Sequence, residues 1–229
     1  MQQIRAAEQV DCRSCFMELR CWPDGAPAPE ALPMERVPAL ARGAALWRPG
    51  DAFSGCYLVR CGALKIVAID AAGDEQVLQF ALPGDLIGLE ALAAGRHDTL
   101  AIALEASGLC RVRWPQLAAA LDPPLQLLLR ASSVLHQRAR TNRRTEPLPA
   151  IRTFIKAIAQ QIGREERSGA ETTVGMHLPM SRLEIGQYLG YSEETVCRCL
   201  RRLHDQGELV VHGRKVLLPT AMPSLAGAG

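Results

Sequence analysis

Turn signals recur about every ten residues between Ala44 and Trp114, and this spacing is the strongest constraint that the sequence places on the fold. Each signal combines glycine with aspartate, proline or arginine and separates two short apolar runs. Strands of this length and spacing are typical of antiparallel barrels and rolls. We therefore expect a β-roll here and, because helical patterns follow it, an α+β fold. The turn signals are WRPGD at 47–51, RCG at 60–62, DAAGDE at 70–75 and LPGD at 82–85.

Composition limits the kind of protein that contains this roll. The chain has 229 residues, 48% of them hydrophobic, with 26 Lys and Arg against 24 Asp and Glu. This length suffices for two small domains, and the near-neutral balance excludes a histone-like polycation. No apolar stretch approaches the roughly 18 residues of a membrane span, and residues 1–12 lack the apolar core of a secretory signal. We expect a cytoplasmic protein without a membrane partner, in which the eight cysteines do not form a disulfide framework.

The long uninterrupted stretch from Pro123 to about Arg144 predicts a helix, with apolar residues at spacings of three and four. Pro147 and Pro149 are expected to end it, and a second helix is expected over 150–164. The apolar stripe of the long helix predicts a parallel dimer seam that includes Leu125, Leu128, Leu135 and Ala139. The expected divisions are a cysteine-rich segment and linker at 1–38, the roll at 39–122, the dimerisation helix at 123–146 and a final domain at 147–229.

Three cysteines lie within ten residues near the N-terminus, as Cys12, Cys15 and Cys21. Three thiolates in one loop can ligate a single metal centre, and a fourth ligand has to come from elsewhere in the chain. The spacing alone fits either zinc or a 4Fe–4S cluster, which commonly takes three close cysteines and one remote cysteine. Candidates for the fourth ligand are Cys56, Cys61 and Cys110, although the strand patterns around Cys56 and Cys61 favour small core residues there.

Residues 182–201 have the pattern of a helix-turn-helix. Gly186 is small where two helices cross closely, and Gly190 lies in the turn, where a positive φ suits glycine. Ser192 is expected to cap the second helix. On the first helix the apolar residues Ile185 and Leu189 lie one turn apart. The inward stripe of the second helix consists of Val196, Leu200 and Leu203.

The alternating segment that follows, GELVVHGRKVLLP, predicts a hairpin with its turn at His212–Arg214, so the unit is expected to be a winged helix. Its second helix would then enter the major groove of double-stranded DNA. On the polar side of that helix we expect Arg198, Arg201 and Arg202 to meet phosphates and guanine edges.

Together these segments resemble the Crp/Fnr family of bacterial transcription regulators, from about Cys12 to Leu218. The resemblance rests on RPGD at 48–51, RCGALK at 60–65, GDEQVLQFALPGDLIGLEAL at 73–92 and the cysteine loop DCRSCFMELRC. The last two segments are similar to the oxygen-sensing Fnr branch. In that branch the loop cysteines and one later cysteine hold a 4Fe–4S cluster. The resemblance therefore implies that Cys12, Cys15, Cys21 and Cys110 are its ligands.

The same resemblance implies a homodimer that binds a palindromic DNA site with TTGAT-like half-sites, and RNA polymerase as a further partner. Glu194 and Arg198 match residues that contact bases in the Fnr branch, while Cys197 replaces a serine there. Relatives that bind cyclic AMP use Gly-Glu and Arg-Ser pairs, but the matching residues here are Gly88-Leu89 and Thr99-Leu100, so no cyclic nucleotide is expected. The branch has an acidic residue in its dimer seam, and here the matching residue is Leu135.

The expected function is therefore a transcription regulator that senses oxygen or redox state and does not act as an enzyme, since no catalytic arrangement of Ser, His and Asp and no phosphate loop is present. The alternative is a regulator of the same fold that senses through zinc or cysteine thiols.

Overall fold

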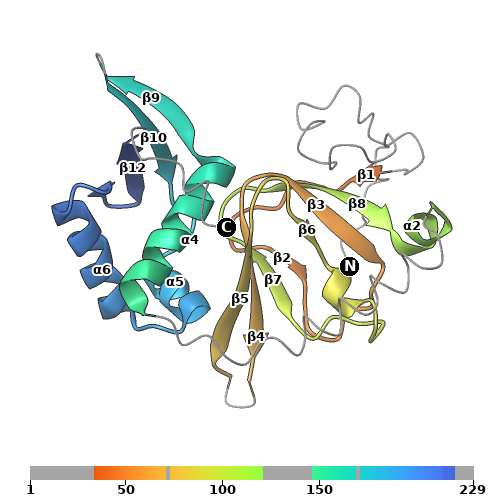
Figure 1. Ribbon diagram of the computed structural model, residues 1–229. Coiled ribbons are helices and arrows are strands. Elements are labelled where there is room, and N and C mark those ends of the chain that lie inside the picture. The colour runs from red at the N-terminus through yellow and green to blue at the C-terminus, as the bar shows by residue number, and fades with distance from the viewer. Residues whose placement is uncertain (1–33, 71–72, 121–145, 169–170, 220–229) are drawn as a thin grey trace, which may run out of the picture. The chain divides into compact units, whose positions relative to one another are not determined.

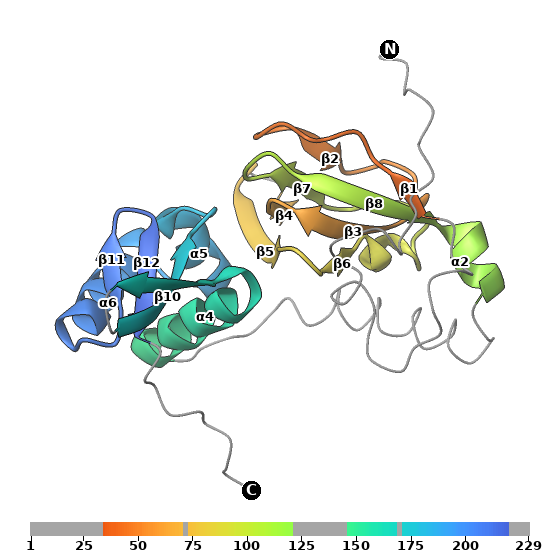
Figure 2. The same cartoon turned by 90° about the horizontal axis from the view of Figure 1, so that it is seen from above.

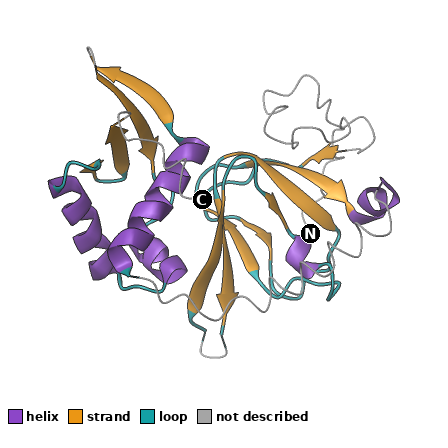
Figure 3. Cartoon of the chain, viewed as in Figure 1, coloured by secondary structure: helices purple, strands orange, loops and turns teal. Residues whose placement is uncertain are grey.

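The computed structural model describes residues 34–70, 73–120, 146–168 and 171–219, and the chain divides into two compact units between Asn142 and Arg143 (Figure 1). Within the described ranges the first unit consists mainly of strands, and the second combines helices with hairpins (Figure 3). None of the helices in these ranges has the length and hydropathy needed to cross a membrane. The three loop cysteines and the whole predicted dimer seam lie outside the described residues.

The first unit is a β-roll made of two antiparallel four-stranded sheets (Figure 2), as the turn spacing predicts. The first sheet has the order β1-β8-β3-β6, formed by Met34–Arg36, Gly108–Arg113, Gly55–Cys61 and Leu86–Ile87. The second sheet has the order β2-β7-β4-β5, formed by Ala45–Trp47, Leu100–Ala103, Leu64–Ile69 and Glu75–Ala81.

Glycine is required in the RCG turn between β3 and β4, where Gly62 has a φ of 79°. A Cβ atom there would lie 2.5 Å from the carbonyl oxygen of Ala106 and 2.4 Å from the hydroxyl of Ser107. The backbone therefore excludes any other residue by both its dihedral angle and its close approach to the 106–107 turn.

Alternation along the strands gives the first sheet two apolar faces. One face lies inside the roll and joins residues of both sheets: Trp47, Tyr57, Val59, Leu64, Ile66, Ala81, Ile87, Ala101 and Leu109. The other, which we call the outer face, consists of Met34, Cys56, Leu58, Cys110 and Val112. Two further side chains pack against the outer face: Leu89 from the short helix η3 (Leu89–Ala91) and Trp114 from α2 (Trp114–Ala120).

In the second unit α6 (Glu193–Asp205) packs against α4 (Pro147–Ile162) and α5 (Arg182–Leu189) (Figure 1). One antiparallel sheet completes the unit, with the order β11-β12-β10-β9 over Val210–His212, Lys215–Pro219, Glu171–His177 and Arg164–Ser168. The expected helix-turn-helix and wing are thus confirmed. The fully buried side chains of this unit include Ile151, Ile155, Ile185, Val196, Leu200 and Leu203.

Two features of the second unit differ from what the sequence predicts. Helix α4 begins at Pro147 rather than at residue 150, with Pro147 and Pro149 in its first turn, where the missing amide hydrogens have no helical acceptor to lose. The stretch that these prolines were expected to end lies outside the described residues. The hairpin of β9 and β10 was not predicted at all. Its first strand, REERS, has four charged residues out of five and no apolar alternation, so its sequence has no strand signal.

Strand β1 is held to β8 by a carboxylate that contacts two arginines. Glu35 accepts hydrogen bonds from Nη2 of Arg111 and from Nε of Arg113, each at 2.6 Å. These side-chain hydrogen bonds, with Arg111 first, keep the pKa of Glu35 below its usual range. We call these three residues the Glu35 clip.

Acid is expected to weaken the Glu35 clip. Because the folded-state pKa is lowered, the stabilisation is fully present above the unfolded pKa of about 4.3 and disappears as pH falls through the folded value. At pH 7 the variant Glu35→Gln should unfold with a free energy about 1 to 2 kcal/mol smaller than that of the natural protein. Denaturant titrations at pH 7 and pH 3 measure this difference in unfolding free energy, which should be smaller at pH 3. An equal difference at both pH values would show that the ionised Glu35 carboxylate does not stabilise the fold.

Candidate nucleic-acid interface and cysteine site

The turn between α5 and α6 is fixed by two serine caps and two glycines. Ser181 and Glu184 form a capping box at the start of α5, and the Ser192 hydroxyl accepts a hydrogen bond from the amide of Thr195 at the start of α6. Gly190 has a φ of 80°, as the sequence predicts. A Cβ on Gly186 would lie 2.4 Å from the carbonyl oxygen of Tyr191, so the close neighbour is the turn backbone rather than the second helix.

Helix α6 presents a continuous polar face to solvent. Its apolar stripe is buried, with Val196, Leu200 and Leu203 at most 1% exposed. This burial orients the opposite face outward, and the sequence-predicted contact residues all lie exposed on the helix: Glu194, Cys197, Arg198, Arg201 and Arg202. Three arginines on the exposed face of one helix, followed by a hairpin, form the arrangement that places side chains in the major groove.

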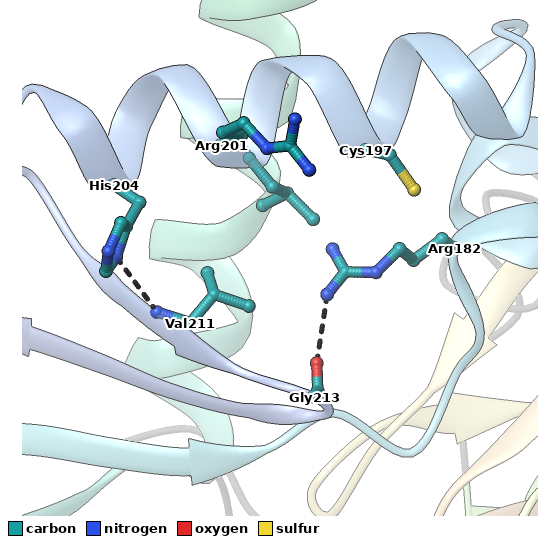
Figure 4. Close-up of a pocket in the computed structure, with 7 residues that line it drawn as sticks. Arg182, Cys197, Arg201, His204, Val211 and Gly213 are labelled. Carbon is teal, nitrogen blue, oxygen red and sulfur yellow. Dashed lines mark hydrogen bonds between the residues drawn. The ribbon is translucent and has the colours of Figure 1, made fainter.

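A hollow of about 330 Å³ lies between α6 and the wing, which is the hairpin of β11 and β12 (Figure 4). Arg182, at the start of α5, spans it and donates from Nη2 to the carbonyl oxygen of Gly213 at 2.9 Å, at the tip of the wing. The amide of Val211 donates to Nδ1 of His204 at 3.4 Å on the other side. Figure 4 shows Cys197 and Arg201 on the helix above Arg182. The first contact joins the tip of the wing to α5, and the second joins the wing to α6.

Arg182 and His204 were missed by sequence reasoning as part of this surface. Arg182 directly follows the capping serine, so a signal for its place at the helix start was present. His204 lies seven residues from its partner Val211 across the turn into the wing, and no local pattern indicates that contact.

Cys110 lies in β8 on the outer face of the first sheet and is 3% exposed. Its cross-strand neighbours are Arg36 in β1 and Leu58 in β3. Because β1 begins at Met34, the chain that comes from the cysteine-rich segment enters the fold on the strand next to Cys110. Among the described residues no group of three or more His, Cys, Asp and Glu is placed to hold a metal ion, and Cys12, Cys15 and Cys21 lie outside those residues.

The other cysteines of the roll differ from one another. Cys56 also lies on the outer face and is 1% exposed, and burial raises the pKa of its thiol to about 11. Cys61, expected as a small core residue, is exposed at the end of β3, so that expectation was wrong. The strand register shifts between Val59 and Cys61, which changes the face on which the last residue of β3 lies.

Inside the roll, Thr99, one of the residues that match nucleotide contacts of other relatives, contacts other side chains of the protein. Thr99 is fully buried, and its hydroxyl accepts a hydrogen bond from the Trp47 indole at 3.1 Å. The same indole stacks on His97 with ring centroids 4.3 Å apart. Nδ1 of His97 lies 3.1 Å from a carboxylate oxygen of Glu90 in η3. Thr99, Trp47, His97 and Glu90 thus form one chain of side-chain contacts. The matching positions hold Leu89 and Thr99, so neither a glutamate nor an arginine is present there to hold a ribose and phosphate.

The roll and the exposed basic helix beside a wing define a winged-helix DNA-binding protein with a β-roll domain before it. Comparison with known proteins supports both parts: a family model described as a cyclic nucleotide-binding domain matches residues 38–122, and one described as a Crp-like helix-turn-helix domain matches residues 155–223. The transcriptional activator protein Anr of Pseudomonas protegens is 31% identical over 98% of this chain and 96% of its own length. The chain belongs to the Crp/Fnr family, whose members are transcription regulators rather than enzymes.

Two further relatives agree with this assignment. The transcriptional regulatory protein btr of Bordetella pertussis is 33% identical over 92% of this chain and 90% of its own length. The solved structure of FixK2 from Bradyrhizobium japonicum has 27% sequence identity and a TM-score of 0.65, covering 82% of this chain and 93% of that one. The similarity thus includes both units of the chain.

Proposed function

We propose that this regulator senses oxygen or redox state through a 4Fe–4S cluster held by Cys12, Cys15, Cys21 and Cys110. The observation that supports the proposal is the pairing of β1 with β8, which brings the end of the cysteine-rich segment to the strand of the fourth cysteine. The donor set fits: four thiolates, three close in sequence and one remote, are the usual ligands of such a cluster. When bound, the cluster would supply an oxygen-reactive redox centre.

The position of Cys110 in the chain can couple cluster ligation to DNA binding. Strand β8 ends at Arg113, and α2 follows directly from Trp114. The same stretch of chain then continues to residues 123–146, which we propose form a parallel dimerisation helix. A shift of β8 at Cys110 therefore acts on the chain that leads into the dimer seam. Two winged helices held one helical turn apart bind DNA far better than one alone, so loss of pairing lowers affinity.

Anaerobic reconstitution with iron and sulfide tests the proposal directly. The protein should turn brown and contain about four iron and four sulfide ions per chain. A colourless protein that holds one zinc ion per chain would establish the zinc alternative, because Cys12, Cys15 and Cys21 with Cys110 also suit a tetrahedral zinc site. A protein that binds neither metal and forms disulfides in air would favour thiol sensing.

We further propose that the partners are double-stranded DNA with TTGAT-like half-sites, a second copy of the chain and RNA polymerase, and that the protein is cytoplasmic. No cyclic nucleotide is proposed as a ligand. The DNA part of this proposal rests on the exposed face of α6, where a bidentate guanidinium of Arg198 would contact O6 and N7 of guanine. Glu194, one turn earlier, would accept a hydrogen bond from a cytosine amino group on the opposite strand.

Variants of α6 should separate base recognition from phosphate binding. Arg198→Ala and Glu194→Ala should remove about 1 to 3 kcal/mol of discrimination for a GA-containing half-site. Arg202→Ala, one turn further along, is the matched control. It should lower the affinity for all DNA sequences equally and reduce the slope of log affinity against log salt concentration by about one. Arg201 should behave like Arg202, and Cys197→Ser should strengthen the preference for TTGAT. Anaerobic binding to a half-site library at two salt concentrations measures these effects. A uniform loss of affinity in Arg198→Ala, together with a changed base preference in Arg202→Ala, would contradict the proposed orientation of α6 in the major groove.

A further inference from the structure

We propose that Glu35 is a positioning residue for the cysteine site: by holding Arg111 and Arg113 of β8, it keeps β1 against the strand that contains Cys110. The inference rests on the proposed function, since it assigns Glu35 to the site that would hold the iron–sulfur cluster. It concerns described residues alone, and none of the three is a proposed metal ligand.

Strand β1 depends on side chains at its N-terminal end, because the backbone hydrogen bonds of this segment continue on the C-terminal side, where Val37 donates to Leu109 (3.0 Å) and Leu40 pairs with Ser107. The strand has three residues and, among the described strands, lies at the edge of the first sheet and pairs only with β8. The paired residues are Met34 with Val112, Glu35 with Arg111 and Arg36 with Cys110. The N-terminal end of a ladder at a sheet edge frays readily.

The side chains of β1 hold it on both faces of the sheet. Met34 is 6% exposed and packs on the outer face with Cys110 and Val112. Glu35 points to the opposite face, where both of its oxygens are bonded to guanidinium groups at 2.6 Å. The Glu35 side chain is 18% exposed, so these charge-assisted bonds are partly shielded from water.

Loss of this contact would act on Cys110 in two ways. Arg36 lies directly opposite Cys110, and Met34 covers the same outer face, so separation of β1 would expose the Cys110 thiol. Separation would also displace residue 34, where the cysteine-rich segment joins the fold. Cys56 provides an internal contrast, because it lies on the same outer face but in β3, which pairs with β8 and β6 and not with β1.

The experiment uses the full-length chain and two measurements. The first is the rate at which iodoacetamide alkylates Cys110 and Cys56 in cluster-free, reduced protein, quantified by peptide mass spectrometry. The variants are Glu35→Gln, which turns an amide NH₂ group toward one guanidinium, and Glu35→Asp, which retains the charge. The matched control is Glu75→Gln, which removes the Lys65–Glu75 ion pair (3.2 Å) elsewhere in the roll. The second measurement is the rate at which the reconstituted cluster is lost in air.

Glu35→Gln should raise the alkylation rate of Cys110 about tenfold more than that of Cys56, whose rate reports global unfolding, and should accelerate cluster loss several-fold. For Glu35→Asp, both rates should lie between those of Glu35→Gln and those of the natural protein. Glu75→Gln should match the natural protein in both rates. Equal acceleration at Cys56 would show a general loss of stability and overturn the proposal. Unchanged alkylation of Cys110, or faster alkylation with unchanged cluster loss, would also overturn it. If the natural protein takes up no cluster, the proposed function fails, while alkylation still decides whether Glu35 holds β1.

Discussion

Replacing Cys110 by serine is expected to abolish the 4Fe–4S cluster, whereas replacing Cys56 by serine leaves it intact. Both thiols lie on the outer face of the first sheet, and both are almost fully buried. They differ in position, since Cys110 lies opposite β1 and Cys56 lies opposite Val112 in β8. A cluster that loses one of four thiolate ligands has an open iron site and is labile.

Serine variants of all eight cysteines, reconstituted without oxygen, measure this effect by absorption spectrum and iron content. The cluster should be lost in the variants of Cys12, Cys15, Cys21 and Cys110. It should be retained at natural yield in the variants of Cys56, Cys61, Cys197 and Cys199. A full 4Fe–4S spectrum in Cys110→Ser, or its loss in Cys61→Ser, would show that the fourth ligand is assigned wrongly.

The second large effect concerns pairing of the chains. Leu128→Asp or Leu135→Asp should give monomers that no longer bind the operator, even when the cluster is intact. The proposed seam through Leu125, Leu128, Leu135 and Ala139 buries apolar side chains between two helices. An unpaired buried charge there costs several kcal/mol on each chain.

Gln137→Asp is a matched control for this experiment, since residue 137 lies on the side of the same predicted helix away from the seam. It should stay dimeric in anaerobic sedimentation. A brown Leu128→Asp protein that sediments as a dimer would refute the seam. Monomers from both Leu128→Asp and Gln137→Asp would show that acid destabilises the helix itself rather than the pairing.

The fold was predictable where local chemistry decides it. The turn signals of the roll require glycine for backbone reasons, as at Gly62, and these reasons are visible in the sequence. The caps and apolar stripe of the helix-turn-helix are likewise local. The start of α4 was expected at residue 150 and lies at Pro147, because proline is compatible both with a helix end and with the first turn of a helix. Strand β9 was missed, because its pairing with β10 is not marked by any apolar pattern.

The candidate site was predictable to a similar extent. The exposed face of α6 follows from its buried stripe, so the places of Arg198, Arg201 and Arg202 were predictable from periodicity, whereas Glu194 and Cys197 were named only through the family resemblance. The Glu35 clip was not, because its partners lie 76 and 78 residues away and meet only through strand pairing. The burial of Cys110 beside β1 likewise depends on register, whereas its role as a ligand was suggested only by family resemblance.

We propose that the state of the cysteine site controls DNA binding, and one titration tests this control most directly. A palindromic DNA with two TTGAT-like half-sites is titrated with reconstituted protein under nitrogen and again after measured exposure to air, with the absorption spectrum recorded on the same samples. Affinity should fall about tenfold or more in step with the loss of the 4Fe–4S absorption, and Cys110→Ser should bind as weakly before air as after it. Equal affinity of the brown and the bleached protein would contradict the account.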